Sequence, residues 1–339
     1  MTIQQNVDLL HYNTFRIQAV AKFFTTIRTV DDAKTLFASE IFRNEKHFLL
    51  GGGSNVLLTK NYDGLVVKVE ILGKEVVDED EESITLRVGA GENWHGFVMY
   101  CVDRNYGGVE NLSLIPGTVG AAPMQNIGAY GVEIKKNILT VEAVEIATGD
   151  VRYFDTEACK FGYRESVFKQ ELKDQFLISS VTLKLTKSDH TFNTSYGAID
   201  ETLRKLGTET LSLKTISDAV IYIRSHKLPD PAKIGNAGSF FKNPSIQADL
   251  MDFIKKDYPN IPSFPSSHGL VKIPAAWLIE QCGWKGKTFD SIGVHQHQAL
   301  VLVNYGGGKG EKIWELAMKI KDSVKEKFNI TLQPEVNVI

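Results

Sequence analysis

The chain has 339 residues, 43% of them hydrophobic, which is enough for about two or three domains with separate cores. Its 38 Lys and Arg residues nearly balance 41 Asp and Glu residues, and the net charge of -3 excludes a global field that would attract nucleic acid or an acidic membrane surface. The N-terminus lacks a signal-peptide pattern, and no run approaches the ~18 apolar residues of a membrane span, so we expect a cytoplasmic protein.

The first predicted elements are two buried strands at residues 47–50 and 65–69, separated by a glycine-rich turn at 51–55. The acidic run 78–82 predicts the solvated tip of a hairpin, and the alternating residues 84–88 predict a half-buried strand. Helical spacing of apolar residues predicts a helix over 94–102. The irregular stretch 106–131 follows, and so long a loop inside a domain is typical of a functional loop.

Further along the chain we expect a helix near 215–225, a turn at 236–241 that leads into a strand, a helix at 275–282 and a strand at 299–303. The run 306–310 fails as a phosphate-binding loop, because its spacing lacks the first glycine and no Ser or Thr follows Lys309, and we expect a flexible turn there. An amphipathic helix packed on a core is predicted near the end, with a membrane or partner role as its alternative; its apolar stripe is Ile313, Ala317, Ile320 and Val324.

The cysteines and two histidines offer little metal-binding potential. Cys101, Cys159 and Cys282 are too far apart in sequence for a CxxC metal site or a disulfide framework, and we expect small core residues. His295 and His297 would share one face of a strand, but no third ligand is near in sequence. We therefore predict structural hydrogen bonding for this pair and no metal.

Two glycine-rich stretches imitate a dinucleotide-binding fingerprint and fail it. The runs 51–56 and 89–94 have the first two glycines, but Val56 and Trp94 replace the third, so a Rossmann domain is not expected. The first turn is nevertheless suited to a pyrophosphate, because unobstructed main-chain N–H groups can converge on phosphate oxygens and the Ser54 and Asn55 side chains add donors. A simple turn between strands is the alternative.

The long loop carries a more specific signal. Gly117, Gly120, Gly128 and Gly131, together with Pro116 and Pro123, specify an unusual main-chain path that would let a flat isoalloxazine ring approach closely. An ordinary omega loop is the alternative. The sequence from 114 to 131 strongly resembles the flavin-binding signature of the UDP-N-acetylenolpyruvoylglucosamine reductase family. Seven further blocks follow that family's order, at 13–15, 51–57, 89–94, 162–166, 227–231, 236–244 and 334–336.

This resemblance implies an α+β fold with a two-domain FAD-binding part of the vanillyl-alcohol oxidase type and a third α+β substrate-binding domain. We expect boundaries at 1–72 with 328–339, at 73–212 and at 213–327. NADPH would be the reductant, and FAD would be non-covalent, because no histidine lies within 51–55. At Ala121 and Ala122, where some family members have serine, flavin contacts would use main-chain N–H groups. The resemblance assigns FAD contacts to Gly51, Gly52, Gly53, Ser54, Asn55, Val56, Ile115, Pro116, Gly117, Ala121, Met124, Gln125, Gly128, Ala129 and Tyr163.

The family's chemistry saturates an enolpyruvyl double bond and needs a hydride donor, a stabiliser of the developing charge and an acid. Ser239 matches the proton donor, Arg164 the arginine that faces the enolate, and Glu335 the third catalytic residue. Because a carboxylate would repel the enolate, our hypothesis is that Glu335 is protonated or shares a proton. The alternatives are a turn cap for Ser239 and a surface ion pair for Arg164. The family usually continues past this glutamate to a glycine, whereas this chain stops at Ile339.

The resemblance also implies a UDP-sugar as substrate, in a monomer with no nucleic-acid or membrane partner. Matching substrate-binding positions are Tyr130, Tyr196, Lys227, Gly238 and Asn243, with Tyr196 on a mobile loop. For Lys227 and Tyr196, an ordinary surface role is the alternative. Two rival functions remain: a flavin oxidase that passes electrons to oxygen, and a nucleotide-sugar binding module without catalysis.

Overall fold

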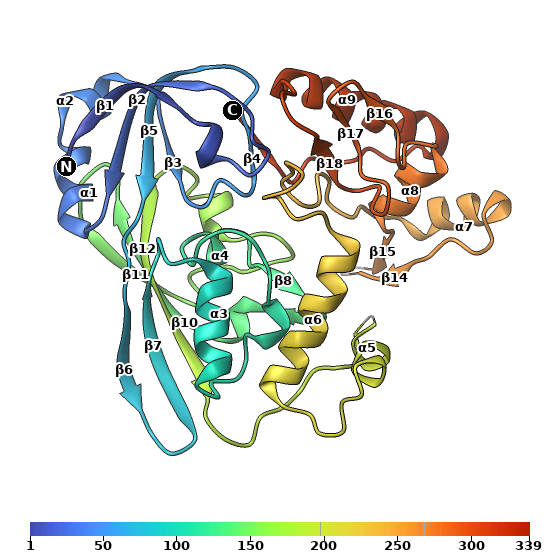
Figure 1. Ribbon diagram of the computed structural model, residues 1–339, viewed down its shortest axis with the longest axis horizontal. Helices are drawn as coiled ribbons and strands as arrows, with labels where there is room; N and C mark the ends of the chain where they lie inside the picture. Colours follow the sequence, from blue (N-terminus) through green and yellow to red (C-terminus); the bar gives the residue numbers. More distant parts are fainter. Residues whose placement is uncertain (197, 267–268) are drawn as a thin grey trace. The chain divides into compact units, whose positions relative to one another are not determined.

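The computed structural model of the protein describes residues 1–196, 198–266 and 269–339, and the chain divides into two units built from separated segments (Figure 1). Unit 1 comprises Met1–Val7, Ala21–Gly52 and Asp63–His226, and unit 2 comprises Asp8–Val20, Gly53–Tyr62 and Lys227–Ile339. The division into three domains stays a prediction.

The first sheet of unit 1 contains the two strands expected around the glycine-rich turn. Its order is β1-β2-β5-β3, with β1 at Ile3–Asp8, β2 at Val20–Ile27, β5 at Tyr62–Val69 and β3 at His47–Leu50. β3 and β5 are parallel, and their register pairs Leu50 with Lys68. Residues 65–67 are fully buried, as is typical of a strand in a parallel pair. Both predicted strands are confirmed.

Two short helices, α1 (Val30–Phe37) and α2 (Glu40–Asn44), lead from β2 to β3. Thr29 begins α1 with a capping box, because its side chain accepts from the Asp32 N–H while the Asp32 carboxylate accepts from the Thr29 N–H. Ser39 caps α2 through the N–H of Phe42. These caps explain where the chain turns into each helix.

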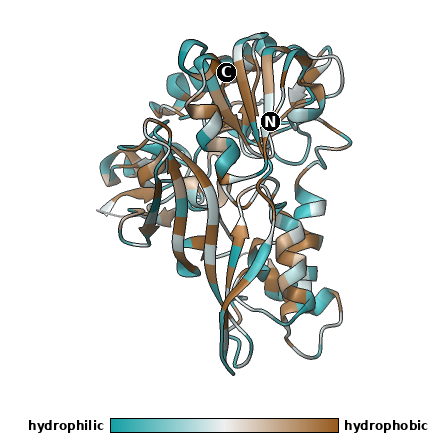
Figure 2. Ribbon diagram, turned by 90° about the vertical axis from the view of Figure 1, so that its left-hand side faces the viewer, coloured by the Kyte–Doolittle hydropathy of each residue, from teal (hydrophilic) through white to brown (hydrophobic). Residues whose placement is uncertain are grey.

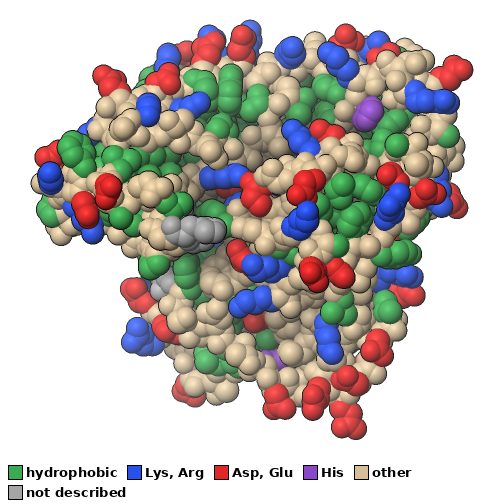
Figure 3. Space-filling view, turned by 180° about the vertical axis from the view of Figure 1, so that it is seen from behind, with side chains coloured by type: hydrophobic (Ala, Val, Ile, Leu, Met, Phe, Trp, Pro, Cys, Tyr) green, Lys and Arg blue, Asp and Glu red, His purple; other side chains and the backbone are tan. Residues whose placement is uncertain are grey.

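The second sheet of unit 1 is antiparallel, in the order β11-β10-β12-β7-β6. Figure 2 shows its long strands alternating between hydrophobic and hydrophilic segments. The acidic run ends the β6–β7 hairpin, and Figure 3 shows acidic side chains gathered at the lower end of the molecule, so the predicted hairpin tip is confirmed. The bounds are Val151–Asp155 for β11, Ile138–Glu145 for β10, Phe176–Thr186 for β12, Ser83–Gly89 for β7 and Lys74–Glu79 for β6.

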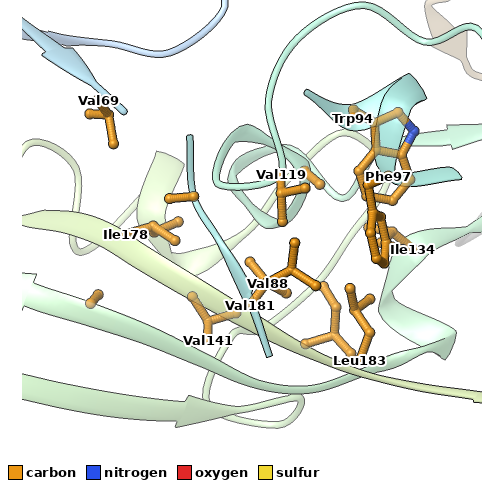
Figure 4. Close-up of a cluster of buried hydrophobic side chains, with 14 of the residues drawn as sticks. Val69, Val88, Trp94, Phe97, Val119, Ile134, Val141, Ile178, Val181 and Leu183 are labelled. Atoms are coloured by element: carbon orange, nitrogen blue, oxygen red, sulfur yellow. The ribbon is translucent and has the colours of Figure 1, made fainter. Parts of the chain in front are cut away.

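The main core of unit 1 lies between this sheet and α3 (Trp94–Asp103), the predicted helix. Figure 4 shows Phe97 of α3 beside Ile134 and close to Leu183 of the sheet. The Trp94 indole N–H donates to the Leu112 carbonyl at 2.9 Å, which satisfies its polar group within the core. Cys101 and Cys159 are fully buried here, as predicted, and burial raises the pKa of the Cys159 thiol to about 12.

The predicted loop 106–131 is less irregular than expected. It contains a 3-10 turn at Glu110–Leu112, the short helix α4 (Ala121–Met124) and β8 (Gly128–Ala129), which pairs with β9 (Val132–Glu133). Near the end of unit 1, α5 (Ile199–Lys205) and α6 (Leu213–Lys227) share a small apolar core. The helix predicted near 215–225 is therefore present as α6 and is slightly longer than expected. Further 3-10 turns occur at Ile134–Lys136 and Val167–Lys169.

The described part of unit 2 contains short strands, three α-helices and a 3-10 turn at Leu10–Tyr12. β4 (Val56–Leu57) pairs in parallel with β19 (Asn337–Val338), so the glycine-rich turn leads to a strand beside the C-terminus. The remaining strands form two small sheets, β13-β15-β14 and β16-β17-β18. The strand bounds are Ser245–Ile246 for β13, Val271–Lys272 for β15, Phe264–Pro265 for β14, Thr288–Phe289 for β16, Ile292–Val294 for β17 and Leu302–Asn304 for β18. The helix bounds are Ala248–Asp257 for α7, Ala275–Gln281 for α8 and Gly310–Phe328 for α9.

Two predicted helices of unit 2 are confirmed, α8 and α9. The apolar stripe of α9 is fully buried, as expected of a helix packed on a core. Among the described residues, no helix has the length and apolar character needed to span a membrane.

Three predictions in unit 2 need correction. Only isolated bridges form within 236–241, where Gly238 has φ 69°, and the strand after the turn is the two-residue β13, which begins at Ser245. The predicted strand at 299–303 begins later, at Leu302. Cys282 is half-buried, with its thiol directed to the Ser323 carbonyl.

Asn304 fixes several segments of unit 2. Its side-chain amide donates to the carbonyl oxygens of Phe15 and Arg16, and its oxygen accepts from the N–H groups of Gly306 and Gly308. The glycine run therefore forms a turn before α9, as predicted, and it is bound by a buried polar side chain.

Candidate active site

The glycine-rich turn and the long loop contact each other through main chain in unit 1. A Cβ atom added to Gly52 would lie 2.8 Å from Gly117 Cα, and one added to Gly51 would lie 2.8 Å from Thr118 Oγ1. At Gly52 the neighbour is backbone, so only glycine permits this approach, whereas at Gly51 the Thr118 hydroxyl could rotate away. The turn and the loop therefore form one cradle lined by backbone.

This cradle presents main-chain donors. No acceptor among the described residues pairs with the N–H groups of Gly52, Gly117 or Thr118. Adjacent N–H groups without acceptors form an anion-binding concavity, or they can donate to the oxygen and nitrogen atoms of a flavin. Because the cradle offers such main-chain donors, the residues present fit the FAD that the sequence predicts.

The N–H groups of Ala121 and Ala122, which the resemblance assigns to flavin contacts, already have partners within the long loop. The N–H of Ala121 donates to the Thr118 carbonyl, and that of Ala122 donates to the Val119 carbonyl, each at 3.0 Å. Both bonds belong to the turn that begins α4, so a flavin contact through these groups would have to share the N–H, and that contact stays a prediction.

Unit 2 holds the rest of the turn. Gly53 has φ 64°, and an added Cβ would collide with the Tyr12 carbonyl oxygen. The N–H of Thr14 donates to the Gly53 carbonyl at 3.1 Å, so the 13–15 block supports the turn. Ser54 is half-buried, the Asn55 amide donates to the Glu335 carbonyl at 3.2 Å, and Val56 begins β4.

The block 162–166 is docked on the long loop in unit 1. Arg164 Nη2 donates to the Gly128 carbonyl at 2.9 Å, and the Ser166 hydroxyl donates to the Met124 carbonyl at 2.6 Å. Arg164 has φ 56°, a left-handed conformation that costs free energy in a non-glycine residue and is concentrated at functional sites. The predicted residues Tyr163, Gln125, Ala129, Ile115 and Pro116 belong to the same unit.

Tyr130 and Arg224 form a polar cluster next to this loop. Arg224 Nε donates to the Leu114 carbonyl at 3.2 Å, and its guanidinium lies within electrostatic range of the Tyr130 side chain. Burial is the main cause that raises the pKa of Tyr130 and lowers that of Arg224, and the nearby positive charge of Arg164 lowers the latter further. Two guanidinium groups near each other favour the binding of an anion.

The segment that carries Tyr196 lies against Tyr130. Asn111 donates through its amide to the carbonyls of Tyr130 and Asn193, and Asn193 donates to the Gly131 carbonyl. Tyr196 is 54% exposed, and an added Cβ at Gly131 would lie 3.2 Å from its Cβ. The structure thus brings two predicted substrate-binding tyrosines together; Gly197, part of the predicted loop, lies outside the described residues.

Ser239 and Glu335 lie on neighbouring main-chain segments of unit 2. Ser239 is exposed and pairs with Val301, and the Glu335 N–H donates to the Phe240 carbonyl at 2.8 Å. Gly238 places the serine after a left-handed turn, with its N–H bonded to Asn236 Oδ1. The arrangement holds Ser239 beside a rigid pair of buried rings, Phe240 and Phe241.

Two other predicted substrate residues are also in unit 2. Asn243 Oδ1 accepts from the N–H of Ala275 at 2.9 Å, so its oxygen already serves the start of α8. Lys227 is exposed and ends α6.

Comparison with known proteins assigns the family. Residues 230–339 match the C-terminal domain of UDP-N-acetylenolpyruvoylglucosamine reductase, and residues 22–155 match an FAD binding domain. The chain is 51% identical to the UDP-N-acetylenolpyruvoylglucosamine reductase of Amoebophilus asiaticus and 49% identical to that of Flavobacterium johnsoniae, with both chains covered completely in each case. The chain belongs to the UDP-N-acetylenolpyruvoylglucosamine reductase family.

A solved structure supports the fold of this family member. The UDP-N-acetylenolpyruvylglucosamine reductase from Thermus caldophilus is similar with a TM-score of 0.69 and 21% identity, over 100% of this chain and 99% of that one. The predicted α+β fold with an FAD-binding part is confirmed.

Sequence reasoning missed Arg224, which the structure places beside Tyr130 and in the electrostatic range of Arg164. The sequence signal that could have found it is its position: Arg224 lies three residues before Lys227, on the last turns of the predicted helix.

The histidine pair has no metal-binding environment in the part of the chain that the structure describes, where no group of three potential ligands occurs. The His295 and His297 rings lie 5.6 Å apart between centroids. The pKa of His295 is lowered mainly by burial and, to a smaller extent, by the charge of His297.

Proposed function

We propose that this protein reduces the enolpyruvyl group of UDP-N-acetylglucosamine enolpyruvate to give UDP-N-acetylmuramate, a precursor of peptidoglycan. The identity of 51% over the full length of a relative with this reductase activity in its name carries the proposal. The FAD binding domain match and the glycine cradle of unit 1 support it. The protein would work in the cytoplasm as a monomer on a UDP-sugar.

FAD is the cofactor and NADPH the reductant. When bound, FAD supplies the hydride transfer from NADPH to the terminal carbon of the enolpyruvyl group. The N–H groups of Gly52, Gly117 and Thr118 would hold it through hydrogen bonds. We propose that it is dissociable, because residues 51–55 contain no histidine for covalent attachment.

The charge that develops on the substrate carboxylate during hydride addition would be stabilised by Arg164. A guanidinium stays charged and can bind a carboxylate with two bonds. The Gly128 carbonyl holds one end of this side chain, which supports a fixed orientation. Tyr130 and Tyr196 in unit 1, and Lys227, Gly238 and Asn243 in unit 2, would bind the rest of the substrate.

Proton delivery to the neighbouring carbon is assigned to Ser239. A serine hydroxyl is a weak acid, so it suits a strongly basic carbanion. Its exposure and the absence of a side chain at Gly238 support access by a substrate. After the transfer, the hydroxyl must regain a proton from solvent or a neighbour.

Glu335 is assigned a protonated state in the reactive complex. We expect Glu335→Gln to retain substantially more activity than Glu335→Ala, because the amide keeps both the shape and a hydrogen-bond donor where a neutral carboxyl would donate. The measurement is kcat for both variants. Equal and complete loss in both variants would count against this assignment.

An absorbance experiment tests the function as a whole. The purified protein should be yellow with flavin bands, NADPH should bleach these bands in the absence of oxygen, and the enolpyruvyl substrate should restore them. A flavin oxidase would be reoxidised by oxygen and not by this substrate. A binding module without catalysis would show no bleaching.

A further inference from the structure

Lys68 is a charged residue in an otherwise apolar part of β5. Leu65, Val66 and Val67 before it are fully buried, and Lys68 itself is half-buried. Burying an ammonium group costs free energy unless an interaction compensates, and this burial lowers the pKa of Lys68. Among the described residues, Lys68 has no ion-pair partner within 4.0 Å, and Glu70 acts on it only at longer range. The lysine is therefore a partly desolvated positive charge with no carboxylate at ion-pair distance in the described part of the chain.

The strand register directs this charge to the glycine cradle. Because Lys68 pairs with Leu50, its side chain lies beside the end of β3 and Nζ donates to the Gly51 carbonyl at 2.6 Å. The peptide that joins Gly51 to Gly52 is planar and trans, so its C=O and N–H point in opposite directions. The Gly52 N–H consequently faces away from Lys68. A hydrogen bond on the carbonyl also polarises the peptide and makes that N–H a stronger donor.

The outward face of this peptide is where an anion would sit. Gly52 is exposed, and no acceptor in the described part of the chain pairs with its N–H or with those of Gly117 and Thr118. A neutral donor would satisfy the Gly51 carbonyl at lower desolvation cost, so the positive charge is useful chiefly if a negative group binds opposite it.

We propose that Lys68 is a positioning residue for a phosphate group of FAD: it holds the Gly51–Gly52 peptide with its N–H toward the phosphate and supplies positive charge behind it. This inference rests on the proposed function, in which FAD is the cofactor. Riboflavin has the same ring system without phosphate, so it should not depend on Lys68.

The test compares FAD and riboflavin binding to protein stripped of flavin, followed by flavin fluorescence. Lys68→Met keeps the apolar stem and removes the charge and the donor. We expect its Kd for FAD to rise about tenfold, which corresponds to about 1.4 kcal/mol, while the Kd for riboflavin stays at the wild-type value. Lys68→Arg should bind FAD within about threefold of wild type, because it keeps both the charge and the donors.

Lys46→Met is the matched control, since Lys46 is an exposed lysine of the same unit, directly before β3. It should leave both affinities unchanged. If Lys68→Met does not fold, Lys68→Gln, which removes the charge but keeps a neutral amide donor on a shorter side chain, gives the same comparison. An unchanged FAD affinity, or equal weakening of FAD and riboflavin, would overturn the proposal. Failure of the wild-type protein to bind FAD would instead refute the proposed function.

Discussion

Replacing Ser239 with alanine is expected to lower kcat by about 10²- to 10⁴-fold, the range that a positioned general acid contributes. Ser239 is exposed, and its pairing with Val301 uses main chain, so the hydroxyl can be removed without disturbing the fold. FAD binding and the reduction of FAD by NADPH should stay at wild-type values. Stopped-flow absorbance without oxygen separates the two half-reactions, and only reoxidation by the enolpyruvyl substrate should slow.

Ser245→Ala is the control for this variant. Ser245 is also an exposed serine of unit 2, and in the described part of the chain its hydroxyl has one hydrogen-bond partner, the Ser266 hydroxyl at 3.0 Å. Both half-reactions should proceed normally in it. Reoxidation of Ser239→Ala at the wild-type rate would remove Ser239 from the chemistry.

The second large effect is expected for Gly52→Ala. The new Cβ would meet the Gly117 Cα at 2.8 Å and the Gly117 carbonyl carbon at 3.2 Å, and backbone atoms cannot rotate away as a side chain can. The turn and the long loop must separate, at a cost of roughly 1–3 kcal/mol. We expect the Kd for FAD to rise at least about tenfold, since the N–H groups of both loops lose their relative placement. Fluorescence titration and urea unfolding measure the two effects.

Gly96→Ala provides the contrast. Gly96 lies within α3, and the nearest atom to an added Cβ is Asn93 Oδ1 at an ordinary 3.4 Å. Alanine should therefore keep FAD affinity and raise stability by roughly 0.5–1 kcal/mol, because glycine is unfavourable in a helix. Wild-type FAD affinity in Gly52→Ala would show that the two loops need not touch.

Elements with a clear hydrophobic period were predictable from the sequence. The strands β3 and β5, the helices α3 and α9 and the acidic hairpin tip all appear where the pattern placed them. Each is defined by neighbours in sequence, such as the buried stripe of α9. The block order of the flavin loop likewise pointed to the correct family and cofactor.

Features that depend on distant contacts were not predictable. The segments Asp8–Val20 and Gly53–Tyr62 belong to unit 2, although most residues of that unit come much later, in Lys227–Ile339. No local sequence pattern shows that these two segments leave unit 1. Three- and four-residue elements such as α4 are too short to show a period. Arg224 was missed because its contact with Leu114 crosses 110 positions.

The most direct test of the central claim is the mass of the product. Protein whose FAD has been reduced by one equivalent of NADPH should, without oxygen, convert one equivalent of the enolpyruvyl UDP-sugar to a species heavier by two hydrogen atoms. Substrate of unchanged mass, with the flavin reoxidised only when oxygen is admitted and hydrogen peroxide formed, would contradict the account.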